Sequence, residues 1–274
     1  ANWRQPLKWD RDAAAAGERP RVFCASLADV FDNHPSILPE WRADLWALIR
    51  ATPNLDWLML TKRPGNIAKM LPPDWGDGYP NVWLGCTVVN QDEADRDIPK
   101  LLSVPARVRF LSMEPLLGPV DLTGWFYGPD TPCAPCTKDE DCECGWQMRR
   151  DLPDDIAPGQ IDLVIVGGES GPGARPMHPD WARSLRDQCQ AAGVAFFFKQ
   201  WGEWAPGENV PDEITGWRAD ATFGPWVGGA DWCYGETDMG DPESNWDDEA
   251  DLFRVGKKAA GRLLDGRTWD QMPG

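Results

Sequence analysis

Six short apolar runs, each followed by polar residues, constrain the fold of this chain most strongly. Their β-branched and aromatic residues are typical of strands that are buried on both faces of a sheet. Most successive runs start roughly 25 to 35 residues apart, which is the length of a strand with its crossover helix. The runs are Val22–Ser26, Trp57–Thr61, Val82–Thr87, Val108–Ser112, Leu163–Val166 and Ala195–Phe198.

The segments between the runs have helical periodicity. Trp41, Leu45 and Leu48 recur at helical spacing after Pro39, and a similar pattern ends before Gly193. Alternating strands and helices predict a parallel sheet. Six strands are too few for a closed eight-stranded barrel, so we predict an α/β fold with a partial or open TIM-like (β/α) barrel of about six parallel strands.

The spacing of the predicted strands divides the chain into two parts. Residues 1–204 are predicted to form the barrel domain, with a Cys-rich insertion over 123–160 that explains one unusually long step between strands. Residues 205–274 are an irregular, acidic extension rich in Trp, Gly and Pro, which we expect to end in a helix over about 249–264. The stretch from Trp3 to Arg21 resembles the tail of a connection, so we expect a further segment upstream.

Composition favours a cytoplasmic protein without a membrane segment. No stretch of the 274 residues approaches the roughly 18 apolar residues of a membrane span, and the first residues lack the apolar centre of a signal peptide. Eight cysteines are too few for a disulfide scaffold of this length. Reduced thiols or metal ligands are therefore favoured.

The net charge of −17 is concentrated in one region. Residues 201–251 contain fourteen acids and one base, Arg218. A second acidic stretch covers 128–156, and the rest of the chain is near neutral. The charge thus excludes a protein that coats polyanions broadly, but it leaves local contacts with nucleic acid or nucleotides open.

Polar residues at the ends of the runs are the candidate site, because the carboxyl ends of barrel strands form the active face. Glu114 and Lys199 are the candidate catalytic acid or base. Glu114 is alternatively an ion-pair partner of Lys62 or Arg63. The candidate substrate-binding residues are Lys62, Arg63, Gln200 and Trp201.

A glycine-rich loop follows the fifth run. Its closely spaced glycines allow the backbone to approach a ligand, while the acid and hydroxyl add polar contacts. It lacks the spacing of a Walker or Rossmann loop, and the alternative is a tight turn between strand and helix. The candidate cofactor-binding residues are Gly167, Gly168, Glu169, Ser170 and Gly171.

The Cys-rich insertion has the strongest metal-binding pattern. Two closely spaced pairs of thiolates suit a tetrahedral ion, so structural zinc is the first interpretation; an auxiliary iron-sulfur cluster and unligated or disulfide-bonded thiols are the alternatives. The candidate ligands are Cys133, Cys136, Cys142 and Cys144.

Other residues have structural interpretations. His178 stands before Pro179, which predicts a role in helix entry rather than in metal binding. Predicted core tryptophans are Trp41, Trp57, Trp83 and Trp181. Trp201 and Trp204 follow the last strand, where they are expected either to pack in the core or to stack on a base or cofactor ring.

Several long motifs, in this order, resemble the phage and prophage family named after gene products thirty-seven and sixty-eight. The resemblance spans roughly residues 3–204 and the closing helix. The motifs are Arg21–Phe31, Leu60–Pro64, Asn81–Gly85, Ser112–Asp121, Gly167–Pro176, Phe198–Gly202 and Gly256–Gly266.

The resemblance implies a radical S-adenosylmethionine-like partial barrel with an iron-sulfur cluster. Members of the family carry an N-terminal Cys-x3-Cys-x2-Cys motif for the cluster, which is not present in this chain. The resemblance implies that the glycine-rich loop contacts S-adenosylmethionine, and it favours nucleic acid or a nucleotide as substrate. Alternatives are a zinc-stabilised binding or adaptor protein without catalytic activity, and a cluster-free barrel enzyme that binds a phosphate ligand.

Overall fold

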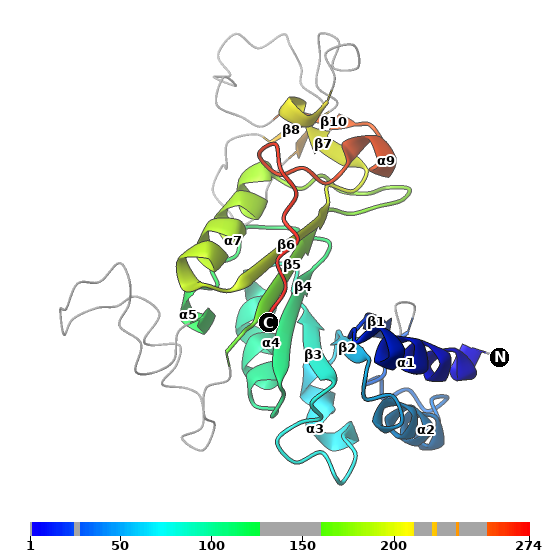
Figure 1. The fold of residues 1–274 in the computed structure, drawn as a ribbon. Helices are drawn as coiled ribbons and strands as arrows, with labels where there is room; N and C mark the ends of the chain where they lie inside the picture. Colours follow the sequence, from blue (N-terminus) through cyan, green and yellow to red (C-terminus); the bar gives the residue numbers. More distant parts are fainter. Residues whose placement is uncertain (1, 25–27, 127–159, 211–220, 224–233, 236–250) are drawn as a thin grey trace, which may run out of the picture.

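A computed structural model describes residues 2–24, 28–126, 160–210, 221–223, 234–235 and 251–274. Six strands form one curled, all-parallel sheet in the order β1-β2-β3-β4-β5-β6, which makes a half-barrel (Figure 1). The predicted α/β class and partial TIM-like barrel are confirmed. The strands are β1 (Arg21–Cys24), β2 (Asp56–Thr61), β3 (Val82–Thr87), β4 (Val108–Met113), β5 (Leu163–Gly167) and β6 (Ala195–Gln200).

The connecting helices begin and end at sequence signals. Pro39 is among the first residues of α2, where its missing N–H costs no hydrogen bond. His178 Nδ1 accepts a hydrogen bond from the backbone N–H of Asp180 at 3.1 Å, so the predicted role in helix entry is confirmed. Gly193 ends α7 at φ 68°. The helices are α1 (Gln5–Ala16), α2 (Pro39–Arg50), α3 (Ile67–Met70), α4 (Gln91–Leu102), α5 (Thr123–Phe126) and α7 (Pro179–Ala192).

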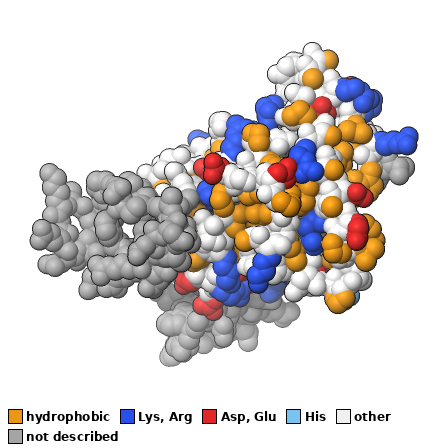
Figure 2. Space-filling model, turned by 90° about the horizontal axis from the view of Figure 1, so that it is seen from below, with side chains coloured by type: hydrophobic (Ala, Val, Ile, Leu, Met, Phe, Trp, Pro, Cys, Tyr) orange, Lys and Arg blue, Asp and Glu red, His pale blue; other side chains and the backbone are white. Residues whose placement is uncertain are grey.

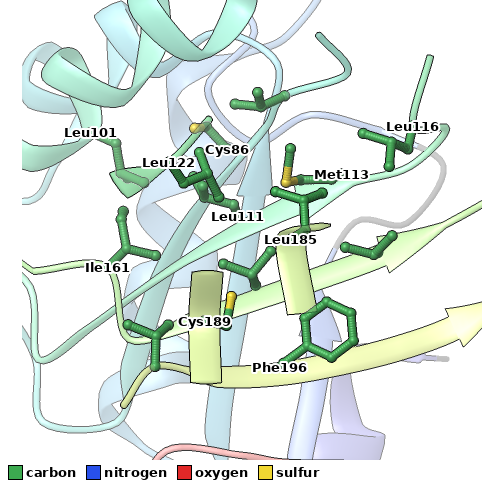
Figure 3. Close-up of a cluster of buried hydrophobic side chains, with 14 of the residues drawn as sticks. Cys86, Leu101, Leu111, Met113, Leu116, Leu122, Ile161, Leu185, Cys189 and Phe196 are labelled. Carbon is green, nitrogen blue, oxygen red and sulfur yellow. The ribbon is translucent and has the colours of Figure 1, made fainter. Parts of the chain in front are cut away.

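Helices cover one face of the sheet. Alternate strand residues such as Leu84 and Leu111 point to this face and belong to a buried cluster with residues of α2, α4 and α7. Figure 3 shows part of this cluster, in which Leu185 and Cys189 of α7 lie near Phe196 of β6. Burial of these side chains is the main contribution to stability.

The other face is the concave inner face of the half-barrel, and most of it is apolar. The ring of Phe110 lies over Gly85 of β3, where an added Cβ would overlap the ring. Figure 2, seen from below, shows hydrophobic side chains gathered at the centre of the molecule with charged side chains around them. We call the buried apolar residues of the inner face the floor: Leu58, Trp83, Val108, Phe110, Leu163 and Ile165.

The C-terminal segment covers the β6 edge of the sheet. Asp270 forms an antiparallel bridge with Phe197, and the backbone N–H of Phe198 donates to the carbonyl oxygen of Trp269 at 2.9 Å. Figure 1 shows this segment, in red, running beside β6. Met272 then packs against the floor.

A second, antiparallel sheet follows the barrel in the order β7-β10-β8-β9. The prediction of one helix over 249–264 was wrong, because the structure has a strand and only a four-residue helix there. Gly256 and Gly261 adopt φ angles of 82° and 67°, which interrupt a helix. The elements are β7 (Trp204–Pro206), β8 (Ala221–Phe223), β9 (Tyr234–Gly235), β10 (Asp251–Arg254) and α9 (Lys257–Ala260); short 3-10 turns cover Asn2–Arg4, Pro64–Asn66 and Gly207–Asn209.

Three of the four predicted core tryptophans are buried, namely Trp57, Trp83 and Trp181. Trp41 is 54% exposed, so its predicted burial was wrong. Trp46 of the same helix fills the core instead, where its ring lies 5.6 Å from that of Trp75.

The predicted Cys-rich insertion lies largely outside the described residues, and only α5 at its start is among them. Within the described ranges, no helix combines the length and apolar character needed to cross a membrane.

Candidate active site

The carboxyl ends of the six parallel strands meet at one edge of the half-barrel, which we call the mouth. Parallel pairing brings side chains from distant parts of the sequence together at such an edge. The described residues at or just beyond these strand ends include Asp29, Lys62, Arg63, Thr87, Ser112, Glu114, Gly167, Gly168, Glu169, Ser170, Gly171, Lys199 and Gln200.

The two predicted catalytic residues contact each other in the mouth. Lys199 Nζ donates to Glu114 Oε2 at 2.9 Å. The Glu114 side chain is 17% exposed and that of Lys199 is 51% exposed, so the pair joins a largely buried anion to a cation that faces solvent. Lys199, rather than Lys62 or Arg63, is therefore the ion-pair partner of Glu114.

Gly167 makes room for this ion pair. It lies on β5, between the strands that supply Glu114 and Lys199, and a Cβ at this position would overlap Glu114 Oε1. That oxygen is buried and has no hydrogen-bond partner among the described residues. A buried acceptor without a donor costs about 1–3 kcal/mol, so a ligand that supplies a donor here gains binding energy.

Two further hydroxyl groups lie below the ion pair on the inner face. Thr87 and Ser112 are paired in register on β3 and β4, and they alternate with residues that face the helices. They are 6% and 3% exposed, and neither hydroxyl has a hydrogen-bond partner in the described parts of the chain. Sequence reasoning missed both residues. Each lies an even number of positions after Trp83 or Phe110 on its strand, which predicts that it lies on the same face of the sheet.

The glycine-rich loop packs tightly against the connection after β6. A Cβ on Gly168 would overlap the carbonyl of Trp201, and a Cβ on Gly202 would overlap the carbonyl of Glu169. The backbone N–H of Gly168 donates to the carbonyl oxygen of Gln200 at 2.9 Å. These glycines thus allow two backbone segments to cross closely.

Internal contacts occupy the polar groups of the same loop. Arg175 Nε donates to Glu169 Oε2 at 2.9 Å, and this hydrogen-bonded guanidinium lowers the pKa of the Glu169 carboxyl. Gln200 Nε2 donates to Ser170 Oγ at 3.2 Å, and the Gly171 N–H donates to Glu203 Oε1 at 3.1 Å. A ligand that uses these groups must therefore share or displace the internal contacts.

On the other side of the mouth, Asp29 organises the β1 and β2 loops. Its carboxylate accepts hydrogen bonds from Thr61 Oγ1 at 2.8 Å and from the backbone N–H of Lys62 at 2.9 Å. Arg63 lies 3.8 Å from Asp29 and 3.5 Å from Asp32. Of the two predicted basic residues, Arg63 is thus engaged in ion pairs, whereas the Lys62 side chain is exposed and makes no ion pair with the described residues.

Comparison with known protein families identifies a match along nearly the whole chain. Residues 1–273 match the family described as "Protein of unknown function (DUF5131)". The chain belongs to the DUF5131 family. No curated protein and no solved structure matches it.

Trp201 of this DUF5131 chain is a core residue. It is 1% exposed, its ring centroid lies 4.9 Å from that of Phe198, and its Nε1 donates to the carbonyl oxygen of Leu263 at 2.7 Å. A residue with these contacts cannot stack on a ligand without leaving the core. Of the two interpretations of Trp201, its contacts therefore favour core packing.

The described cysteines do not converge. Cys86 and Cys189 are buried in the helix-side core, and Cys24 at the end of β1 packs against it. Burial raises the thiol pKa of Cys24 to about 11 and that of Cys189 to about 12, and it raises that of Cys86 as well. Within the described ranges, no three His, Cys, Asp or Glu side chains are grouped for a metal ion. The predicted ligands Cys133, Cys136, Cys142 and Cys144 lie outside the described residues.

Proposed function

We propose that this DUF5131 chain forms the wall of an S-adenosylmethionine-dependent enzyme and binds that ligand in the mouth of the half-barrel. One observation carries the proposal: Glu114 and Lys199 form an ion pair across Gly167 at the active edge of a parallel half-barrel. The resemblance of the sequence to radical S-adenosylmethionine-like proteins supports the choice of ligand.

The mouth has polar groups that suit this ligand. The amino-acid end of S-adenosylmethionine has an ammonium group that can donate to Glu114 and a carboxylate that can accept from Lys199. The unpartnered Thr87 and Ser112 hydroxyls can bond to its ribose.

The described residues do not fit an iron-sulfur cluster. Cluster ligands are thiolates that lie close together, whereas Cys24, Cys86 and Cys189 are dispersed along the helix side of the sheet.

The contact between Glu114 and Lys199 supports a second candidate, a cluster-free enzyme in which these two residues transfer protons. The two groups are in direct hydrogen-bond contact, and one of them reaches solvent. Such an enzyme would bind a ligand at the same residues but would show no preference for S-adenosylmethionine over a phosphate ligand.

Isothermal titration calorimetry with S-adenosylmethionine tests the proposal. Glu114→Gln keeps the side-chain shape and removes the charge, so we expect the affinity to fall roughly 10- to 100-fold, which corresponds to one hydrogen bond to a charged group. Glu18→Gln is the matched control, because Glu18 is exposed and lies outside the mouth. Equal affinity in both variants, or no binding to the wild-type chain, would overturn the proposal.

A further inference from the structure

We propose that the substrate of this site is a single strand of nucleic acid, which crosses the mouth with phosphates on Lys62 at one end and on Lys257 and Lys258 at the other. This inference rests on the proposed function of the mouth as an active site. It adds the class of substrate and the surface that binds it.

The first contact is Lys62, directly after β2. Its backbone is fixed by the hydrogen bond from its N–H to Asp29. Its side chain is exposed and makes no ion pair with any described residue, in contrast to Arg63 beside it. Lys62 is therefore a free cation at a fixed position in the mouth.

The second contact is the lysine pair of α9. Both side chains are exposed and form no ion pair within the described part of the chain. Two backbone hydrogen bonds attach this segment to the residues that follow β6: Gly256 N–H donates to Glu203 at 3.0 Å, and Trp201 N–H donates to Gly261 at 3.2 Å. The segment that carries Lys257 and Lys258 is thus attached to the β6 side of the half-barrel.

Among the described residues, the charge balance at the strand ends differs from that of the whole chain. The carboxylates of Asp29, Glu114 and Glu169, which follow β1, β4 and β5, are each engaged by a cation. The lysines at the two ends of the mouth have no such partner, although the chain has a net charge of −17. These lysines therefore favour a ligand with negative charge at both ends of the mouth.

The separation of β2 from β6, the strands beside the two contacts, favours a strand over a mononucleotide. Four strand spacings separate β2 from β6, which is about 19 Å around the curved sheet and an upper limit for the straight path between these two strands. Phosphates repeat about every 3.4 Å along the axis of one strand of a duplex, so a segment of several nucleotides can reach both ends. A single strand is favoured because a base that reacts at Glu114 and Lys199 must leave any stack to enter the mouth.

Fluorescence anisotropy with labelled single-stranded DNA and RNA of about 15 nucleotides tests the inference. For Lys257→Ala/Lys258→Ala we expect the magnitude of the slope of log affinity against log salt to fall by about 1.4. The loss of affinity relative to wild type should therefore be about 25-fold greater at 0.1 M salt than at 1 M salt. Lys62→Ala should lower the slope by about 0.7. Lys8→Ala/Lys69→Ala removes the same charge from α1 and α3 and should leave binding unchanged.

The outcomes separate this inference from the proposed function. If neither oligonucleotide binds while S-adenosylmethionine does, the inference is overturned and the proposed function stands. Equal losses of affinity in Lys257→Ala/Lys258→Ala and in the control Lys8→Ala/Lys69→Ala also overturn the inference, because they would show non-specific electrostatic attraction to the whole protein. If oligonucleotides bind as expected but S-adenosylmethionine does not, the strand surface is supported and the proposed cofactor is wrong.

Discussion

The floor and the mouth, at the two ends of the inner face of the half-barrel, differ in how many polar side-chain groups lack a hydrogen-bond partner. On the floor, Phe110 and its neighbours are buried against one another, and Gly85 accommodates the ring closely; Trp83 Nε1 is the one side-chain polar atom of the floor, and it has no partner among the described residues. In the mouth, on the same strands, the Thr87 and Ser112 hydroxyls and one oxygen of Glu114 have no partner among the described residues.

This difference shows how one sheet separates stability from chemistry. Apolar side chains gain free energy when they are buried together, whereas buried polar atoms without partners lose it. The floor therefore contributes to folding, and the mouth retains polar groups whose partners a ligand can supply. Substitutions at the two ends should accordingly differ in their effects on unfolding and on binding.

The largest effect is expected on the floor. Phe110→Ala removes a fully buried ring and leaves a cavity, so the free energy of unfolding should fall by about 3–5 kcal/mol. Urea denaturation followed by tryptophan fluorescence measures it. A loss below about 1 kcal/mol would show that the floor is not packed as described.

Gly167→Ala should affect both unfolding and binding. The new methyl group would overlap the Glu114 carboxylate, so we expect a loss of about 1–3 kcal/mol in stability and a loss of S-adenosylmethionine affinity. Gly118→Ala is the control, because its nearest atom, Asn90 Cβ, is at an ordinary distance of 3.9 Å. If calorimetry gives both variants wild-type affinity, Gly167 does not position the pair.

The Glu169–Arg175 pair should make stability depend on pH. Because the folded pKa of Glu169 is lowered, its contribution is present above the ordinary pKa of 4.5 and is lost as the pH falls through the folded value. We expect Arg175→Met to lower Tm at pH 7 and to have a smaller effect near pH 3. A Tm difference that stays constant over this range would contradict the assignment.

The smallest effect on stability is expected in the mouth. Ser112→Ala removes a hydroxyl that makes no hydrogen bond with the described residues, so the free energy of unfolding should change by less than about 1 kcal/mol. Thr52→Val is a useful contrast, since Thr52 Oγ1 accepts from Trp57 Nε1 at 3.0 Å and donates to Leu48. Chemical denaturation of both variants should show the greater loss for Thr52→Val; the reverse order would indicate an internal partner for Ser112.

Much of the barrel was predictable because strand burial leaves a local signal. Apolar runs and the alternation of strands with helices are sufficient for the order of six parallel strands, and Glu114 and Lys199 were predictable as residues of the mouth. Their mutual contact was not, because it depends on curvature and on the space above Gly167, which bring residues 85 positions apart together.

Two errors have a common physical cause in tertiary context. A helix was expected over about 249–264, but pairing of β10 with β7 and the positive φ of Gly256 override the helical spacing. The exposure of Trp41 likewise depends on how α2 is oriented over the sheet, since Trp46 fills the core. Neither outcome can be read from periodicity alone.

A double-mutant cycle for ligand affinity tests the central claim most directly, namely that Glu114 and Lys199 act together in a ligand site. S-adenosylmethionine affinity would be measured by calorimetry for wild type, Glu114→Gln, Lys199→Met and the double variant. We predict a coupling energy of at least about 0.5 kcal/mol between the two substitutions, because the residues are in direct contact. Additive losses, or no loss in either single variant, would contradict the account.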